Sequence, residues 1–158
     1  MKLMKNWIIE IASLGVCISV FVIISINQTK YNNQKFKKIV DYYMILNCWL
    51  KNKQKERNIC EFFEKNNYKE IAIYGMKELG ERLIDELKGQ NINIKYIIDK
   101  NKNIIVNDIP VYHPNNVLPE VDAIVVTASF YFTEIKEMLE SKLDCEVVSI
   151  DDVIFSQY

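Results

Sequence analysis

Residues 71–83 read IAIYGMKELGERL, an apolar run that stops at a glycine and passes into a helical pattern. Gly75 ends the run, and Gly80 follows with the spacing of the first and third glycines of a G-x-G-x-x-G turn. In such a turn the first glycine makes the bend, the second lets a pyrophosphate approach the backbone, and the third lets helix and strand pack closely. Lys77 occupies the middle position, so a side chain stands where the closest approach is needed.

Strand and helix patterns alternate on both sides of this turn. The expected strands are 69–75, 93–99, 109–112, 122–128 and 145–150, and the expected helices are 59–66, 78–89 and 133–143. Strands that are apolar on nearly every residue need cover on both faces, and amphipathic helices between them supply it. The pattern therefore predicts an α/β fold with a doubly wound, mostly parallel Rossmann-like sheet of about five strands.

The amino-terminal part of the chain has a different composition. Residues 7–26, WIIEIASLGVCISVFVIISI, hold a single charge and are long enough, as a helix, to cross a hydrocarbon core of roughly 30 Å. We therefore predict a transmembrane anchor over residues 1–27, a basic juxtamembrane helix over 28–57 and a Rossmann-like nucleotide-binding domain over 58–158. A cleaved signal peptide is the alternative for the apolar run.

Charge divides along the chain in the same way. Residues 1–27 carry two basic and one acidic side chain, residues 28–57 eight and two, and residues 58–158 ten and eighteen; these nets of +1, +6 and −8 sum to −1. Because lysines are more frequent after the apolar run than before it, the positive-inside rule places the carboxyl side in the cytoplasm. The prediction is a single-pass protein of the cell membrane with a cytoplasmic carboxyl-terminal domain.

Residues 34–57 contain no glycine or proline and are expected to be helical. Apolar residues follow one another at alternating intervals of three and four, the spacing of a heptad seam: Phe36, Ile39, Tyr43, Leu46 and Leu50. This seam suits a homodimer through residues 34–57. The other interpretation is a helix that lies on its own domain or on the membrane surface.

A candidate ligand site follows from the turn. Asp99 ends the second expected strand, where an acid accepts hydrogen bonds from a ribose 2′-hydroxyl and repels a 2′-phosphate, which favours NAD over NADP. The helix amino terminus offers N–H groups to an anion, to which Lys77 adds charge. Residues after the fourth strand are expected to face the turn. The expected cofactor-binding residues are Gly75, Met76, Lys77, Leu79, Gly80, Asp99, Lys100, Thr127 and Ser129. The alternative is that both glycines serve packing alone and Asp99 merely ends a strand.

The sequence shows no catalytic triad, no acid pair of defined spacing and no metal-ligand cluster, so no catalytic or metal-binding residue is predicted. His113, the only histidine, lies in an expected loop and is assigned a surface role. The four cysteines are widely spaced and are typical of reduced thiols.

Five segments carry a family resemblance: IAIYGMKELGERLIDEL, IKYIIDKN, IPVYHP, VDAIVVTASFYFTEI and VVSIDDVI. They resemble the small Rossmann-like domains encoded among bacterial capsule and exopolysaccharide genes. They are similar, over roughly residues 58–155, to the membrane-proximal nucleotide-binding domain of the nucleoside-diphosphate-sugar epimerase/dehydratase family. In that family a separate catalytic dehydratase domain follows, and no counterpart is expected here.

The leading hypothesis is a membrane-anchored module that binds NAD or a nucleotide sugar and acts as a sensor or accessory protein in cell-surface polysaccharide synthesis. One alternative is a small NAD-dependent sugar-nucleotide oxidoreductase or epimerase completed by a partner chain. Another is a dimerising scaffold with a ligand-free Rossmann frame. The expected partners are a nucleotide or nucleotide sugar, the membrane, a second copy of the chain and polysaccharide-synthesis enzymes, but not nucleic acid.

Overall fold

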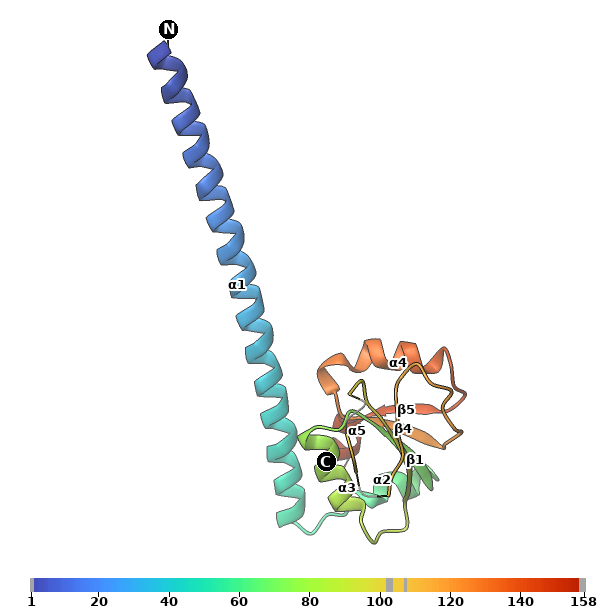
Figure 1. The fold of residues 1–158 in the computed structure, drawn as a ribbon. Coiled ribbons are helices and arrows are strands. Elements are labelled where there is room, and N and C mark those ends of the chain that lie inside the picture. The colour runs from blue at the N-terminus through green and yellow to red at the C-terminus, as the bar shows by residue number, and fades with distance from the viewer. Residues whose placement is uncertain (1, 102–103, 107, 157–158) are drawn as a thin grey trace. The chain divides into compact units, whose positions relative to one another are not determined.

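The computed structural model describes residues 2–101, 104–106 and 108–156, without the side chains of residues 2–14, 16 and 17. Its elements are α1 (Lys2–Gln54), α2 (Cys60–Lys65), β1 (Glu70–Tyr74), α3 (Glu78–Leu87), β2 (Asn93–Ile98), β3 (Val111–Tyr112), β4 (Ala123–Val126), the 3-10 helix η1 (Ser129–Tyr131), α4 (Phe132–Glu140), β5 (Glu146–Ser149) and α5 (Ile150–Phe155) (Figure 1). The chain forms two compact units, Met1–Tyr43 and Met44–Tyr158.

The first unit consists of the greater part of helix α1. No glycine or proline occurs between residues 16 and 74, so one helix continues from the expected anchor into the expected juxtamembrane segment. Within the described part of the chain, no helix is both long enough and apolar enough to span a membrane. The predicted span, residues 7–26, includes side chains that the structure does not describe. The membrane anchor therefore stays a prediction.

Helix α1 ends inside the second unit, at Gln54 rather than at the expected residue 57. Glu56 adopts a left-handed backbone with φ of 55°. Its N–H donates to the carbonyl of Lys53 at 3.0 Å, and the N–H of Arg57 donates to the carbonyl of Asn52 at 3.0 Å. These two bonds form a Schellman motif, which satisfies the last carbonyls of the helix and turns the chain away from it.

The last turns of α1 pack within the second unit. Trp49 is buried, and the Asn52 side-chain amide donates to the carbonyl of Ile154 in α5 at 2.9 Å. Lys53 Nζ lies 2.6 Å from Glu86 Oε2 of α3. The end of the basic helix therefore lies on its own domain, as one of the two interpretations of residues 34–57 expected.

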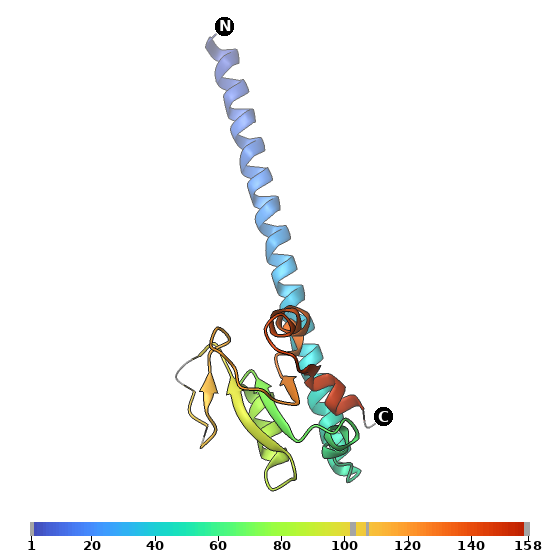
Figure 2. The same ribbon diagram turned by 90° about the vertical axis from the view of Figure 1, so that its right-hand side faces the viewer.

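The second unit contains the predicted five-stranded parallel sheet, with strand order β3-β2-β1-β4-β5. Tyr74 of β1 pairs with Ile98 of β2 on one side and with Val126 of β4 on the other. Strand order reverses between β1 and β4, which is where ligands bind in sheets of this kind. Helices α3 and α4 lie on opposite sides of the sheet, and Figure 2 shows the strands from a second direction.

Alternate residues of the strands point to the two faces. One face forms a buried cluster with α4, and its members are Ala72, Tyr74, Tyr96, Ile98, Leu118, Ile124, Val126, Ile135, Leu139 and Val147. Helix α3 is amphipathic as expected, and Leu79, Leu83 and Leu87 form its buried face. Cover on both faces explains why β4 can be buried at every residue.

The chain after β5 differs from the expectation. The strand was expected to reach Ile150, but β5 ends at Ser149 and helix α5 begins there. The Ser149 hydroxyl oxygen accepts from the Asp151 N–H at 3.2 Å, and the Asp152 carboxylate accepts from the Ser149 N–H at 3.1 Å. This reciprocal capping starts a helix directly from the strand end.

Candidate functional site at the carboxyl edge of the sheet

Gly75 makes the bend that follows β1. Its φ is 95°, a left-handed conformation that favours glycine. Its N–H donates to the carbonyl of Ile98 at 2.8 Å, and a Cβ at this position would lie 2.9 Å from Thr127 Oγ1. A larger residue would therefore be both strained and crowded, so Gly75 has the first role that the sequence pattern assigned to it.

Gly80 lies in the first half of α3, against the same bend. A Cβ at Gly80 would strike the carbonyl oxygen of Gly75 and come 3.3 Å from Met76 Sδ. Such a clash would push the helix away from the strand end. Gly80 thus has the close-packing role of the third glycine, and its neighbour Leu79 belongs to the buried face of α3.

Thr127 closes the turn from the β4 side. Its N–H donates to the carbonyl of Tyr74 at 2.9 Å, and its hydroxyl lies 2.7 Å from the carbonyl oxygen of Gly75 and 3.1 Å from that of Tyr74. The residue is only 7% exposed. The hydroxyl that was expected to contact a ligand donates instead to the backbone, because β4 lies beside β1. Ser129, two residues further, begins η1 and is half-buried.

Asp99 approaches the turn from the β2 side. One carboxylate oxygen accepts from the Met76 N–H at 2.8 Å, and the other accepts from the Asn101 N–H at 2.8 Å. A carboxylate has about four acceptor positions, and these bonds use two of them. Asp99 lies at the glycine turn, as the sequence pattern indicated. It also holds the turn in place through the Met76 N–H, and no local sequence pattern predicts this contact.

Charges of both signs surround the turn. Lys77 precedes the first turn of α3 with an extended backbone, and both Lys77 and Lys100 are exposed. Glu78 and Glu81 lie in the first turn of α3, where carboxylates complement the positive end of the helix dipole. Together with the Asp99 carboxylate, these two carboxylates would repel a highly charged anion above the turn. Neither glutamate was among the predicted site residues.

Tyr74 precedes the glycine turn, and His113 follows Tyr112, whose carbonyl accepts from the Asp99 N–H. Burial, and secondarily the Asp99 carboxylate, raises the pKa of Tyr74, so its hydroxyl stays protonated at neutral pH. His113 Nδ1 accepts from the Asn115 N–H at 3.2 Å, and the residue is half-buried in the segment after β3. Across the described ranges, no group of three or more His, Cys, Asp or Glu side chains could hold a metal ion.

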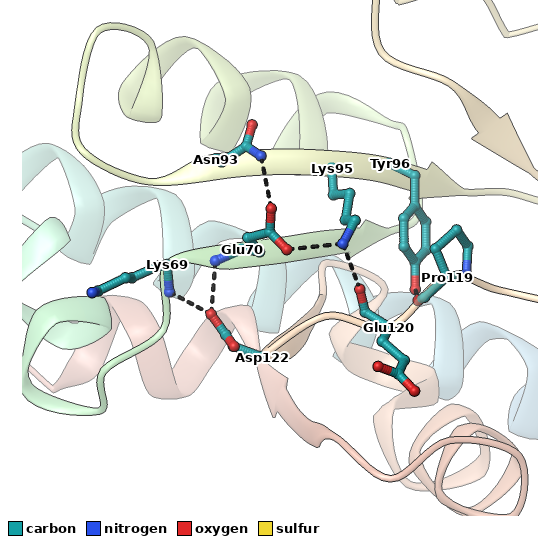
Figure 3. Close-up of polar contacts among 8 residues, drawn as sticks. All are labelled: Lys69, Glu70, Asn93, Lys95, Tyr96, Pro119, Glu120 and Asp122. Carbon is teal, nitrogen blue, oxygen red and sulfur yellow. Dashed lines mark hydrogen bonds and ion pairs between the residues drawn. The ribbon is translucent and has the colours of Figure 1, made fainter.

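The amino edge of the sheet carries a second network of polar contacts (Figure 3). One Asp122 carboxylate oxygen accepts from the N–H groups of Lys69 and Glu70 at 2.7 and 2.8 Å. These two bonds hold the pKa of Asp122 below its usual value of 3.8. The hydrogen bond and ion pair to Lys95, 2.8 Å from Nζ to Oε2, likewise lower the pKa of Glu70.

The same network fastens the segment before β4 to the sheet. Lys95 Nζ donates to the carbonyl of Glu120 at 3.0 Å, and the Tyr96 hydroxyl donates to the carbonyl of Pro119 at 2.7 Å. Burial raises the pKa of Tyr96 to about 12, so the hydroxyl remains a donor. Each of these contacts joins groups of the fold to one another, which makes the amino edge a structural clamp.

Comparison with known proteins gives one match. The family model described as C2185-like, N-terminal matches residues 67–150, a segment that includes the glycine turn, Asp99 and Thr127. No curated protein and no solved structure matches the chain.

Proposed function

We propose that this chain, which belongs to the C2185-like, N-terminal family, is a membrane-anchored module that binds a nucleotide, either NAD or a nucleotide sugar. The observation that carries the proposal is the bond between Asp99 and the Met76 N–H, which aims a carboxylate with open acceptor positions at the glycine turn. A ribose offers two neighbouring hydroxyl donors to such a carboxylate. Support also comes from the position of this bond, beside the point where strand order reverses.

The charges around the turn favour particular nucleotides. Asp99 would repel a 2′-phosphate, and Glu78 and Glu81 add negative charge at the start of α3. NAD is therefore proposed to bind more tightly than NADP. Lys77 is exposed and is proposed to pair with the phosphate that a bound nucleotide carries.

An accessory or sensor role in cell-surface polysaccharide synthesis is proposed from the family resemblance. Among the described residues at the turn, Asp99 is a hydrogen-bond acceptor, Lys77 is exposed and the Thr127 hydroxyl faces the backbone. Such a set supports binding more directly than turnover, because turnover needs a nucleophile or a paired acid and base.

Isothermal titration of the full-length chain in detergent micelles with NAD, NADP, UDP-glucose and coenzyme A tests the binding proposal. We expect saturable heat with NAD or UDP-glucose, and roughly tenfold or greater weakening in Asp99→Asn, since one hydrogen bond to a charged group is worth about 1.5–3 kcal/mol. Asp122→Asn is the matched control, because Asp122 also binds backbone N–H groups but at the opposite edge. Absence of heat with all four ligands would refute the proposal.

Membrane anchoring through residues 1–27, with the second unit in the cytoplasm, is part of the proposal. Extraction of cell membranes with alkaline carbonate should leave the full chain in the pellet and release a chain that lacks residues 1–27. Release of the full chain by carbonate would contradict the anchor. Protease protection of the second unit in spheroplasts, with digestion in inverted vesicles, would establish its side of the membrane.

A second candidate function, a dimerising scaffold, is favoured by the exposed seam on α1. Phe36 and Tyr43 are 69% and 62% exposed, and Ile39 and Leu50 are also exposed. Light scattering of the chain in detergent should give a dimer that Phe36→Lys with Tyr43→Lys converts to a monomer. Tyr31→Lys, an equally exposed position outside the seam, is the control. A monomeric wild-type chain would refute this candidate.

A further inference from the structure

Helix α1 carries a cluster of lysines soon after the apolar run of residues 7–26. Residues 28–43 contain four lysines and one acidic residue. Lys30, Lys35 and Lys37, which we call the basic face, are exposed on α1. Among the described residues, none of these three lysines is in an ion pair. Their positive charges are therefore open to an anionic partner.

The basic face is largely separate from the heptad seam. Because an α-helix turns about 100° per residue, Lys37 lies about 20° from Lys30 around the helix axis. Ile39, in the middle of the seam, lies about 180° from Lys30, on the opposite side of the helix. An anionic partner on the basic face therefore does not compete for the surface that a second copy of the chain would cover.

The direction of α1 brings the lysine side chains toward the apolar run. Side chains of an α-helix lean toward its amino terminus, and the apolar run precedes the lysines in one unbroken helix. Lys30 lies about 6 Å and Lys37 about 17 Å beyond Ile26 along the axis, at 1.5 Å per residue. The long stem of lysine lets its ammonium group reach back to an interface. With the run in a bilayer, the Lys30 ammonium lies within the headgroup layer, which is about 5–8 Å thick.

Tyr31 lies at the same level of the helix. It follows Lys30 directly and is 61% exposed, although its ring is large and mostly apolar. Tyrosine is enriched at membrane–water interfaces, because its ring is compatible with acyl chains and its hydroxyl with water. An exposed tyrosine beside an exposed lysine, just beyond a twenty-residue apolar run, is the arrangement that the headgroup layer favours.

We propose that the basic face of α1 binds the phosphate groups of anionic phospholipids in the leaflet next to it. This inference rests on the proposed membrane anchor and adds which lipids surround that anchor. Attraction to a negatively charged leaflet falls off within a Debye length of about 8 Å, so Lys30 contributes most and Lys37 least. Residues 58–158 carry a net charge of −8 and cannot supply this attraction in their place.

The test measures the lipid selectivity of the full-length chain in phosphatidylcholine bilayers. Electron spin resonance of spin-labelled phosphatidylglycerol and spin-labelled phosphatidylcholine gives the ratio of their association constants at the protein surface. One lysine near an anionic surface corresponds to roughly fivefold in affinity, so we expect the wild type to prefer phosphatidylglycerol by about that factor. The triple variant Lys30→Gln, Lys35→Gln and Lys37→Gln should show almost no preference. Salt at about 1 M, where the Debye length is about 3 Å, should reduce the preference of the wild type.

Lys55→Gln with Lys69→Gln and Lys88→Gln is the matched control, because it makes the same change of charge at exposed lysines outside the basic face. Lys30→Gln alone should reduce the preference more than Lys37→Gln alone. Equal selectivity in the triple variant and the control overturns the inference and leaves the membrane anchor standing. A wild type without any preference does the same. A wild type that restricts the motion of neither lipid does not lie in the bilayer, and this result overturns both the anchor and the inference.

Discussion

The two edges of the sheet use the same residue type in different ways. At the amino edge one oxygen of Asp122 accepts from two consecutive N–H groups, and Lys95 and Tyr96 bind carbonyls of the segment before β4. At the carboxyl edge Asp99 divides its oxygens between the Met76 and Asn101 N–H groups. A carboxylate that binds backbone N–H groups is therefore not by itself a mark of function. Asp99 differs from Asp122 because it lies at the carboxyl ends of the strands, the edge where ligands bind in sheets of this kind.

Gly80→Ala, at the carboxyl edge, is expected to lower the free energy of unfolding more than any of the other substitutions below. The added Cβ would strike the Gly75 carbonyl oxygen, so α3 must shift, and the free energy of unfolding should fall by about 2–3 kcal/mol. Urea unfolding followed by the fluorescence of buried Trp49 measures the change. Glu81→Ala, an exposed position on the same helix, should stay within about 0.5 kcal/mol. A stable Gly80→Ala variant would show that the turn does not need this close packing.

Tyr96→Phe probes the clamp at the amino edge. The substitution removes the donor that binds the Pro119 carbonyl at 2.7 Å, and the free energy of unfolding should fall by about 1–2 kcal/mol. Nucleotide affinity should not change, because the contact is at the opposite edge from the turn. Thermal unfolding measures the loss, with Tyr43→Phe on the exposed part of α1 as the control. A loss of nucleotide affinity would break the distinction between the two edges.

Asp122→Ala and Asp99→Ala test whether the two carboxylates have different roles. Each removes a carboxylate that accepts two backbone hydrogen bonds, and each should cost about 1 kcal/mol of unfolding free energy, because the freed N–H groups can bind water. Only Asp99→Ala should also weaken nucleotide binding. Parallel urea unfolding and titration calorimetry separate the two effects. Equal affinities in both variants would assign Asp99 the purely structural role of Asp122.

The smallest effect is expected in the dependence of stability on pH. The pKa values of Glu70 and Asp122 are lowered in the folded protein from ordinary values of 4.5 and 3.8. Their contribution is complete above those values and is lost as pH falls through the lower folded ones, because the unfolded chain then binds more protons. Urea midpoints between pH 6 and pH 3 should decline less steeply in Glu70→Gln with Asp122→Asn. An unchanged slope would show that other carboxylates control acid stability.

Much of the second unit could be predicted from local patterns. The runs around Ile73 and Val125 are apolar at consecutive positions, which indicates strands covered on both faces, and Gly75 and Gly80 mark the turn from β1 into α3. The start of α5 at Ile150 was missed because the apolar run continues through it, and the Ser149 cap outweighs that run. The end of α1 was placed too late, since Glu56 adopts a conformation that usually belongs to glycine.

Local sequence patterns were enough to predict the parallel α/β frame, the glycine turn and the acid at the end of β2, because hydrophobic periodicity and backbone freedom are local properties of the chain. The partners of Asp99 and Thr127 depend on how the strands pair: they are the Met76 N–H and the Gly75 carbonyl, which lie 23 and 52 residues away along the chain. These residues come together in space because β2 and β4 pair with β1 on its two sides. The strand order therefore decides which polar side chains support the turn.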